Sequence, residues 1–430
     1  MMNDYHLIEF YRLTPSRLLL AMSCIIALAS ACGPDKGTYV VVQPTGMLTP
    51  ELRAEATLDG KSYGPAQDFS GLHDSFVLQL PPETKGRFRV DIKGYAGDAC
   101  AASVGSSEVS LEGQDLYNVS VDLQTPRLAP CQVSGSQINR IVGYNRNDVW
   151  AVGDNATMLH WDGKSWMQFP QDGLFNDNFI AAGWSPSRGE ILFVGGEGRI
   201  VRRNGNINSL LSSGVSEGLT GITGDRDAAE VWIVGLNGTI LRQESTGWSS
   251  KSPAGNDWFP ASRPEDKKGR HLLDIARLFN GSFYAVGMNG LVLRKDSGSS
   301  AWTQQPVGTT VNLHRIIATS TDAWIVGGQG TLLRWVNGSW IKQTLQTQYG
   351  GRLLSVAEIA PNVLLLGGER GTVLRCDYSV QPLSCTQWSA DASSELWSIW
   401  SDKSSVSFVG GAPPNPSGQV SSATVFRFQQ

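Results

Sequence analysis

From about residue 138 to the C-terminus, short hydrophobic runs alternate with glycine-containing polar turns in a pattern that recurs along the chain. The clearest copy is DVWAVGDNATMLHWDGKSW, at residues 148–166. In this copy a hydrophobic run ends in glycine, a polar turn follows, and a second run leads through Asp162-Gly163 to Trp166. Short apolar runs bounded by such turn residues predict β-strands rather than helices.

The glycine that ends the second strand of each copy measures the length of the repeat. The spacings between successive copies are 42, 40, 52, 40, 40 and 43 residues. The aligned glycines are Gly153, Gly195, Gly235, Gly287, Gly327, Gly367 and Gly410. A repeat of this length is typical of one four-stranded blade of a β-propeller, so the seven copies predict a seven-bladed propeller over residues 126–430.

The last copy ends early, because its third strand is predicted at residues 423–428 and the sequence ends at Gln430. Its outer strand is therefore missing. The segment 129–134 precedes the first copy and has no partner of its own there. We expect this segment to supply the missing strand and to close the ring between the two ends of the propeller.

A different pattern fills residues 38–125, where short runs with period-two alternation are separated by turns such as Asp59-Gly60 and Pro81-Pro82. Alternation of this kind suits strands with one face in a core and the other in water. The runs lie at 39–42, 52–58, 75–80, 87–93, 107–111 and 117–123. They predict a small β-sandwich, immunoglobulin- or prealbumin-like, that serves as a stalk; the alternative is an independent binding module. All fourteen tryptophans lie beyond this region, which marks a domain boundary.

Residues 1–31 have the pattern of a secretory leader. Arg12 and Arg17 precede an apolar run over residues 18–31, which is too short to span a membrane as a helix. The run ends in LASAC, which resembles the lipobox of bacterial lipoproteins, in which the cysteine, here Cys32, is lipidated and becomes the mature N-terminus. An ordinary secretory signal cleaved near Ala31 is the alternative. Residues 32–37 then form a tether.

The compartment follows from the same resemblance. Gly33 stands where an aspartate would retain a lipoprotein at the inner membrane, so we expect a lipid-anchored protein of the cell envelope, at the outer membrane rather than the inner. Charged residues make up 17% of the chain and the net charge is −4, which provides no field for nucleic acid or an anionic membrane surface. Membrane contact is therefore expected through the lipid anchor only.

Four cysteines remain besides the lipidated one and one in the leader. In an oxidising compartment we expect them to form two disulfides. Pairing Cys376 with Cys385 and Cys100 with Cys131 closes the shortest loops, and each bridge would then contribute about 3 kcal/mol. The rival interpretation, a metal site, lacks a CxxC or HxxxH spacing.

The repeats resemble those of a known family. Trp150-x-Val152-Gly153 and Trp324-x-Val326-Gly327 are similar to the repeats of bacterial propeller lipoproteins, which are similar in turn to the photosystem II assembly factor and to Asp-box propellers. The resemblance covers residues 137–430 and implies the architecture without naming a ligand. The Asp-box itself is reduced here, as in Asp162-Gly163-x-Ser165-Trp166, and it forms turns rather than carrying chemistry. Gly-Gly pairs also resemble those of kelch repeats.

Because Asp-box propellers include sialidases, the alternative function is a propeller-type glycan-active hydrolase or lyase. That chemistry needs an arginine cluster, a tyrosine nucleophile and an acid/base carboxylate around the channel. Arginines occur near the starts of the predicted inner strands, at Arg140, Arg270, Arg315 and Arg352. Without a sialidase start motif, we interpret them as solvated residues at the channel mouth.

Other motifs do not add a chemical site. Residues 214–218 match the G-x-S-x-G string around Ser216, but they lie in a loop with no helical pattern after it. Asp172, Asn176, Asp177 and Asn178 do not have the spacing of an EF-hand, and the five histidines are scattered. We therefore predict no metal and no cofactor.

The longest spacing contains an insertion, SPAGNDWFPASRPEDKKGR, at residues 252–270. Its aromatic residues Trp258 and Phe259, with Arg263, Lys267 and Lys268 nearby, have the composition of an interface hot spot. The alternative is a loop that folds Trp258 back over its own blade.

These observations together predict an all-β, monomeric binding or scaffold protein without catalytic activity. Its partner would be an envelope protein or a glycan, met at the face that carries the insertion.

Overall fold

The computed structural model describes residues 10–13, 37–46, 51–64, 66–70, 75–97, 100–124, 126, 128–169, 178–185, 190–223, 230–251, 270–347, 349–389, 394–404, 407–412 and 423–428. The chain divides into two compact units, Met1–Pro130 and Cys131–Gln430. The chain is all-β, as predicted, and no α-helix occurs in the residues described. In that part of the chain, no helix is long and apolar enough to cross a membrane.

The first unit contains two sheets. One has the strand order β1-β6-β2-β9, with β2 and β9 parallel; the other has the order β4-β3-β7-β8, with β5 also paired to β3. The strands are β1 (Phe10–Leu13), β2 (Thr38–Gly46), β3 (Glu51–Leu58), β4 (Lys61–Ser62), β5 (Gln67–Ser70), β6 (Ser75–Leu80), β7 (Lys85–Tyr95), β8 (Ser103–Glu112) and β9 (Leu116–Leu123).

One apolar cluster draws on both of these sheets. Val40 of β2 and Val119 of β9 belong to it together with Phe88, Val90 and Ile92 of β7. The buried residues of β7 alternate with more exposed ones, which is the period-two pattern that the sequence shows at residues 87–93. The sheet that contains β7 therefore buries one face of this strand, whereas in the other sheet the paired residues Val41 and Val77, which are not part of the cluster, are buried as well.

The second unit contains the strands of seven four-stranded sheets among the residues described, except that β10 of the seventh sheet comes just before Cys131. The first three are β11 (Ile138–Asn145), β12 (Asp148–Gly153), β13 (Met158–Trp161) and β14 (Trp166–Gln168); β15 (Phe179–Trp184), β16 (Glu190–Gly195), β17 (Ile200–Asn204) and β18 (Ile207–Leu211); and β19 (Leu219–Ile222), β20 (Trp232–Gly235), β21 (Ile240–Glu244) and β22 (Gly247–Ser250).

The fourth to sixth sheets are β23 (Leu272–Arg277), β24 (Phe283–Gly287), β25 (Val292–Lys295) and β26 (Thr303–Gln304); β27 (Leu313–Ala318), β28 (Ala323–Gly327), β29 (Leu332–Val336) and β30 (Ser339–Lys342); and β31 (Leu353–Ala360), β32 (Val363–Gly368), β33 (Thr372–Asp377) and β34 (Ser384–Ser389). The seventh has the order β10-β37-β36-β35, from β35 (Glu395–Ser401), β36 (Ser407–Ala412), β37 (Thr424–Phe428) and β10 (Leu128–Pro130).

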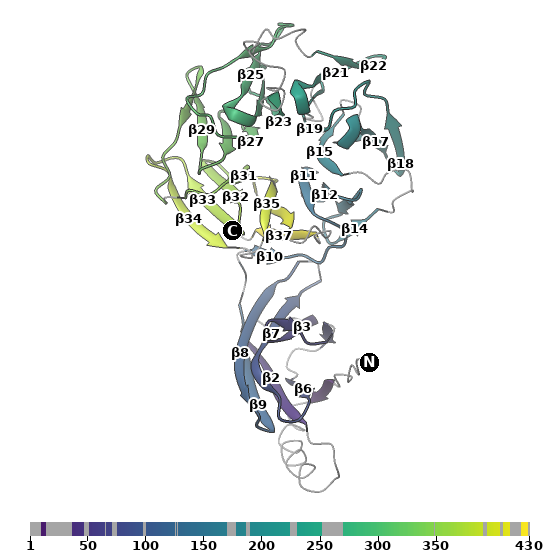
Figure 1. Cartoon of the computed structure of the whole chain (residues 1–430), viewed down its shortest axis with the longest axis vertical. Helices are drawn as coiled ribbons and strands as arrows, with labels where there is room; N and C mark the ends of the chain where they lie inside the picture. Colours follow the sequence, from purple (N-terminus) through teal and green to yellow (C-terminus); the bar gives the residue numbers. More distant parts are fainter. Residues whose placement is uncertain are drawn as a thin grey trace. The chain divides into compact units, whose positions relative to one another are not determined.

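The seven sheets are arranged in a ring, with β11, β15, β19, β23, β27, β31 and β35 innermost (Figure 1). The two ends of the ring meet. The Cys131 N–H donates to the Val425 carbonyl oxygen at 2.8 Å, and the Ala423 N–H donates to that of Gly135 at 3.0 Å. At the centre, the Ile141 N–H of the first sheet donates to Ser398 Oγ of the seventh at 2.8 Å. The segment before the first sheet is therefore bonded to the last sheet, and the innermost strands of the first and last sheets are bonded to each other at the centre of the ring.

A glycine stands at the end of the second strand of each sheet because the backbone there passes close to the inner strand. At Gly287 a Cβ atom would collide with the His271 carbonyl oxygen, and the same collision recurs at the equivalent glycines. The backbone at Gly287 is extended, with φ −166°, so a close approach and not a left-handed conformation requires glycine. The register places Gly368 and Gly411 at this position, each one residue later than the Gly367 and Gly410 predicted from spacing.

The turn after this glycine joins one sheet to the next. Its second residue is left-handed in six sheets, at Asn155, Glu197, Asn237, Asn289, Gln329 and Arg370. In three of them the N–H of that residue donates to a side chain at the start of the next inner strand: Asn155 to Asn178 Oδ1, Asn237 to His271 Nδ1, and Asn289 to Asn312 Oδ1, at 3.0 to 3.1 Å. These side chains act as bridges between neighbouring sheets.

The tryptophans of the second strands lie in packed surroundings. Trp150, Trp232 and Trp324 are buried, and each lies under a cation. Those cations are Arg203, Arg242 and Arg334 respectively. Burial of large rings beside a guanidinium stabilises the contacts between strands and sheets.

Cys376 of β33 lies directly opposite Cys385 of β34, and the two form the predicted disulfide. Cys100 and Cys131 are both disulfide-bonded as well. Their pairing with each other stays a prediction.

Candidate binding site at the centre of the ring

One residue near the start of each inner strand lies at the same depth in the ring. A register shift separates the first residue from the third in six inner strands, and the second from the fourth in β35, so the chain bulges between the two and turns the later residue to an equivalent position. The residues at this position are Arg140, Ala181, Gly221, Asp274, Arg315, Ser355 and Ser398. Two arginines, one aspartate and four small residues therefore form one tier.

Asp274 lies between the two arginines of this tier. Its Oδ1 is 2.6 Å from Arg140 Nη2 and 3.9 Å from Arg315 Nη1, and its Oδ2 accepts the Ile316 N–H at 3.0 Å. The side chains of Arg140, Asp274 and Arg315 are only 12%, 2% and 10% exposed. Arg140 belongs to the first sheet and Asp274 to the fourth, so this ion pair crosses the ring. The small residues of the intervening sheets, Ala181 and Gly221, carry no side chain that would fill this space.

The cluster contains more positive than negative charge. Arg315 Nη2 also donates to the Trp397 carbonyl oxygen of the seventh sheet at 2.6 Å, but Nε of Arg140 and Nε of Arg315 have no hydrogen-bond partner in the described structure. Burial, and then the charge of Arg140, lower the pKa of Arg315 to about 9, and Asp274 opposes this. Arg315 therefore stays protonated at neutral pH, and two guanidinium groups face one carboxylate.

A cavity of about 190 Å³ opens beside this cluster, toward the C-terminal ends of the inner strands. Arg140 and Asp274 line it, with Thr223, Glu230 and Arg277 among the other lining residues. Both lining carboxylates are in ion pairs, because Glu230 bonds to Arg242 at 2.8 Å. Arg277 is exposed and lies over the Phe283 ring at 5.8 Å. Two arginines and two carboxylates therefore line the cavity, and Arg315, the second cation of the cluster, is not among the lining residues.

The structure corrects the interpretation of the arginines. Arg140 and Arg315 are buried across the centre of the ring, and the expectation that they are solvated is wrong. Arg352 is 43% exposed and lies apart from the cluster, where it bonds Glu369 at 2.9 Å and also pairs with Glu395. The hydrogen bond to Glu369 raises the pKa of Arg352 further. No metal-binding group of three or more acidic, histidine or cysteine residues occurs in the described part of the chain.

The sequence patterns do not identify Asp274 as a residue of the channel. A signal existed, since Asp274 is the acidic residue at the third position of an inner strand, LLDIAR, where the other strands carry arginine or a small residue. Trp258, Phe259, Arg263, Lys267 and Lys268, with the rest of residues 252–269, lie outside the described residues, as do Asp172, Asn176 and Asp177. The binding role expected for the insertion stays a prediction.

His314, next to Arg315 on β27, lies in a positively charged environment. Burial first, then the charges of Arg352 and Arg315, lower the pKa of His314 to about 4, and its Nε2 has no hydrogen-bond partner in the described structure. The imidazole is therefore neutral in the folded protein at neutral pH.

We expect this histidine to make the fold acid-sensitive. Its folded-state pKa lies below the unfolded value of about 6.5, so the unfolded chain binds the proton first as the pH falls. The stability is complete above about pH 6.5 and decreases toward pH 4, by about 3 kcal/mol from this residue. In urea unfolding measured between pH 4 and 7, His314→Gln should flatten this decrease relative to wild type. Parallel curves for the two proteins would contradict the assignment.

The repeats and the fold were compared with known proteins. No family model matches the chain. Among curated proteins, it is 28% identical over 130 residues to the photosystem II assembly lipoprotein Ycf48 of Synechococcus sp. (strain CC9605), which covers 25% of this chain and 38% of that protein. The Ycf48 of Synechococcus sp. (strain CC9902) is 33% identical over 85 residues, 19% and 25% of the two chains. The chain thus matches less than two-fifths of the length of these relatives.

Solved structures match over a greater length. A structure titled YCF48 bound to D1 peptide has a TM-score of 0.54 and 17% identity, and the match covers 71% of this chain and 96% of that one. The WD40 repeats of RRP9 have a TM-score of 0.56 at 8% identity, covering 70% and 97%. The ring is therefore a β-propeller. More particularly, it resembles the propeller of the photosystem II assembly lipoprotein Ycf48, as the tryptophan–glycine repeats predict.

Proposed function

We propose that this protein is a lipid-anchored, extracytoplasmic propeller that binds an acidic extended segment of a protein partner and has no catalytic activity. The observation that carries the proposal is the excess of buried positive charge beside the central cavity, where Arg140 and Arg315 share the single carboxylate of Asp274. A carboxylate of the partner would balance this charge. The peptide in the similar YCF48 structure supports a protein segment as the ligand class.

The proposed organisation follows the predicted boundaries. Residues 1–31 would be removed as a leader, Cys32 would carry the lipid, residues 32–37 would be a tether, and residues 38–125 would form the sandwich. Residues 126–430 would form a propeller of seven blades, closed by the segment 129–134. The joining of β10 and β37 in one sheet supports this closure. Loss of the leader would remove β1 and leave β6 at the edge of its sheet.

The location is proposed from the lipobox alone. We place the protein in the cell envelope, at the outer membrane rather than the inner, as a monomer. The insertion residues Trp258, Phe259, Arg263, Lys267 and Lys268 would add a second contact for the same partner. A glycan is the other ligand class to be tested.

Fluorescence anisotropy with two labelled peptides tests the charge of the ligand. The peptides are acetyl-Gly-Ala-Glu-Glu-Ala-Gly-amide and its counterpart with glutamine in place of glutamate. We expect the acidic peptide alone to bind, and Arg277→Gln to weaken it by about 10-fold, because an exposed arginine of the cavity makes a charge-assisted contact.

The control is Arg294→Gln. Arg294 lies on β25, away from the cavity, and forms an ion pair with Asp296. Equal affinity for the two peptides, or no binding to either by the folded protein, would refute the acidic-segment proposal.

A further inference from the structure

The tier at the centre of the ring carries one positive charge that no side chain balances in the part of the chain described. Arg140 and Arg315 supply two guanidinium groups, and the Asp274 carboxylate is their only ion-pair partner there. The side chains of Arg315 and Asp274 are 10% and 2% exposed, so water does not screen the excess. A buried charge without a counter-ion is strongly unfavourable, and the folded protein therefore gains stability from any group that supplies one.

The remaining polar side chains near the tier do not supply this charge. The Ser355 hydroxyl donates to the Leu396 carbonyl oxygen at 2.8 Å, and Ser398 Oγ accepts the Ile141 N–H at 2.8 Å. Both hydroxyls thus join neighbouring sheets. His314 on β27 is neutral at neutral pH, because burial and the nearby arginines lower its pKa to about 4. None of these groups offsets the excess cation.

The carboxylates farther from the tier have cations of their own. Glu230 bonds to Arg242 at 2.8 Å. Glu369 and Glu395 both bond to Arg352, whose side chain is 43% exposed, so water screens this second group. The excess positive charge therefore stays with the buried cluster.

The two guanidinium groups of the cluster keep donors for a further ligand. Arg140 bonds to Asp274 through Nη2, and Arg315 bonds to the Trp397 carbonyl oxygen, also through Nη2. Nε of each arginine has no partner among the described residues. Nη1 of Arg315 is 3.9 Å from Asp274, which is too far for a hydrogen bond. Because both groups face the same carboxylate oxygen and each has five N–H donors, one small acceptor can bond to both.

The cavity beside the cluster gives a small ligand room and access. Its volume is about 190 Å³, enough for several groups of the size of a water molecule. Arg140 and Asp274 line it, and so do Thr223 and Ala318, near the C-terminal ends of two inner strands. A ligand of this site is therefore expected to be small and negatively charged, and to enter from that side of the ring.

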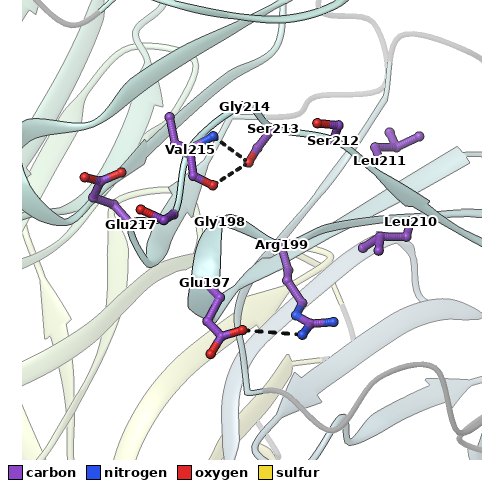
Figure 2. Close-up of a pocket in the computed structure, with 11 residues that line it drawn as sticks. Glu197, Gly198, Arg199, Leu210, Leu211, Ser212, Ser213, Gly214, Val215 and Glu217 are labelled. Carbon is purple, nitrogen blue, oxygen red and sulfur yellow. Dashed lines mark hydrogen bonds and ion pairs between the residues drawn. The ribbon is translucent and has the colours of Figure 1, made fainter.

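A larger hollow elsewhere in the ring does not have this charge. It is an open notch of about 910 Å³ beside the outer strand β18, lined by residues 210–217 and by the turn 197–199 (Figure 2). The one cation among its lining residues, Arg199, pairs with Glu197 at 3.5 Å, and Glu217 adds a second carboxylate. The notch is therefore negatively charged overall, and the central cluster is the better site for an anion.

We infer that the free protein binds a small monovalent anion, of the size of chloride or formate, between Arg140 and Arg315. The excess of one positive charge matches one such ion, and charge-assisted hydrogen bonds from two guanidinium groups would hold it. In the complex, the carboxylate of the acidic segment would displace this ion, so that chloride competes with the partner. The displacement rests on the proposed function, whereas the anion site itself does not.

Urea unfolding of the full chain at neutral pH tests the site, with sodium chloride replacing sodium gluconate, a bulkier anion, at constant ionic strength. A ligand that binds only the folded state lowers the unfolding equilibrium constant in proportion to its concentration once this exceeds Kd. We expect chloride at about ten times its Kd to lower this constant about 10-fold. A parallel series in sodium formate distinguishes a halide from a carboxylate, and stabilisation by either ion supports the site.

Two variants remove the excess charge. Arg315→Gln and Arg140→Gln each leave one cation for one carboxylate, so each should weaken chloride binding at least about 10-fold. The matched control Arg294→Gln removes an arginine that is 29% exposed and paired with Asp296, and it should respond to chloride like wild type. If neither variant of the tier folds, a crystal of the wild-type protein grown in sodium bromide decides. An anomalous scattering peak is expected between the two guanidinium groups.

Equal stability of the wild-type protein in chloride, formate and gluconate would overturn the inference. So would an equal chloride response of Arg315→Gln and wild type, or a bromide crystal without a peak at the cluster. The acidic peptide separates this inference from the proposed function. Stabilisation by chloride without peptide binding refutes the proposed function alone. Peptide binding that is independent of chloride, in a protein that chloride does not stabilise, refutes the anion site alone.

Discussion

Replacing Asp274 with asparagine is expected to lower the free energy of unfolding by about 3–5 kcal/mol, because it leaves two buried guanidinium groups without their counter-ion. The Asp274 carboxylate is 2% exposed, so water cannot substitute for the lost charge. Urea unfolding at neutral pH, followed by tryptophan fluorescence, measures the change. The control Asp296→Asn removes the partner of Arg294 at a carboxylate 57% exposed, and should cost about 1 kcal/mol or less.

A double-mutant cycle tests the charge argument itself. Adding Arg140→Gln to Asp274→Asn removes one of the two unbalanced cations, so the double variant should be more stable than the sum of the two single losses implies. If the two losses simply add, the cluster is not electrostatically coupled, and the excess of buried positive charge would have to be abandoned as an argument.

Replacing Gly287 with alanine is expected to cost more than about 4 kcal/mol, a loss in the range reserved for steric conflict in a packed core. The new Cβ atom would collide with the His271 carbonyl oxygen, which is main chain and cannot rotate away. Thermal unfolding and the yield of soluble protein measure the effect.

Gly298→Ala is the matched control. Gly298 is left-handed, with φ 77°, but no atom lies within 4 Å of the position of a new Cβ. This variant should lose only about 1 to 2 kcal/mol from backbone strain. Similar losses for Gly287→Ala and Gly298→Ala would show that conformation, and not close approach, requires glycine at the end of the second strand.

Much of the architecture could be predicted because it depends on local patterns. The alternation in β7 and the apolar runs of the second strands set which faces are buried. The repeat length follows the glycines, which the close approach of two strands requires at each copy. The one-residue error at Gly368 and Gly411 has a local cause, since both follow a second glycine and spacing alone does not distinguish the two.

The central cluster could not be predicted, because its members are far apart in the sequence. Arg140 and Asp274 are separated by 134 residues, and no periodic pattern links them. The sequence therefore predicts only the average behaviour of arginine, which is to be solvated. Only the register shift shared by the inner strands shows that Arg140, Asp274 and Arg315 lie at one depth.

The exposure of Leu210 on the outer strand β18 (Ile207–Leu211) differs from both cases. Leu210 is visible in the sequence as an apolar residue in a short run, and such residues are usually buried. Its outward position depends on its pairing with Val201 of β17, which the linear order does not reveal.

By itself, then, the sequence determined the all-β character of the chain, the repeat and its approximate boundaries, and the pairing of Cys376 with Cys385. Each of these depends on residues close together along the chain. The tertiary structure alone decided which arginines are buried, that Asp274 lies between them, and which outer strand exposes a leucine. These features arise when the ring brings distant strands to the same depth, and side chains there are governed by neighbours that the linear order does not reveal.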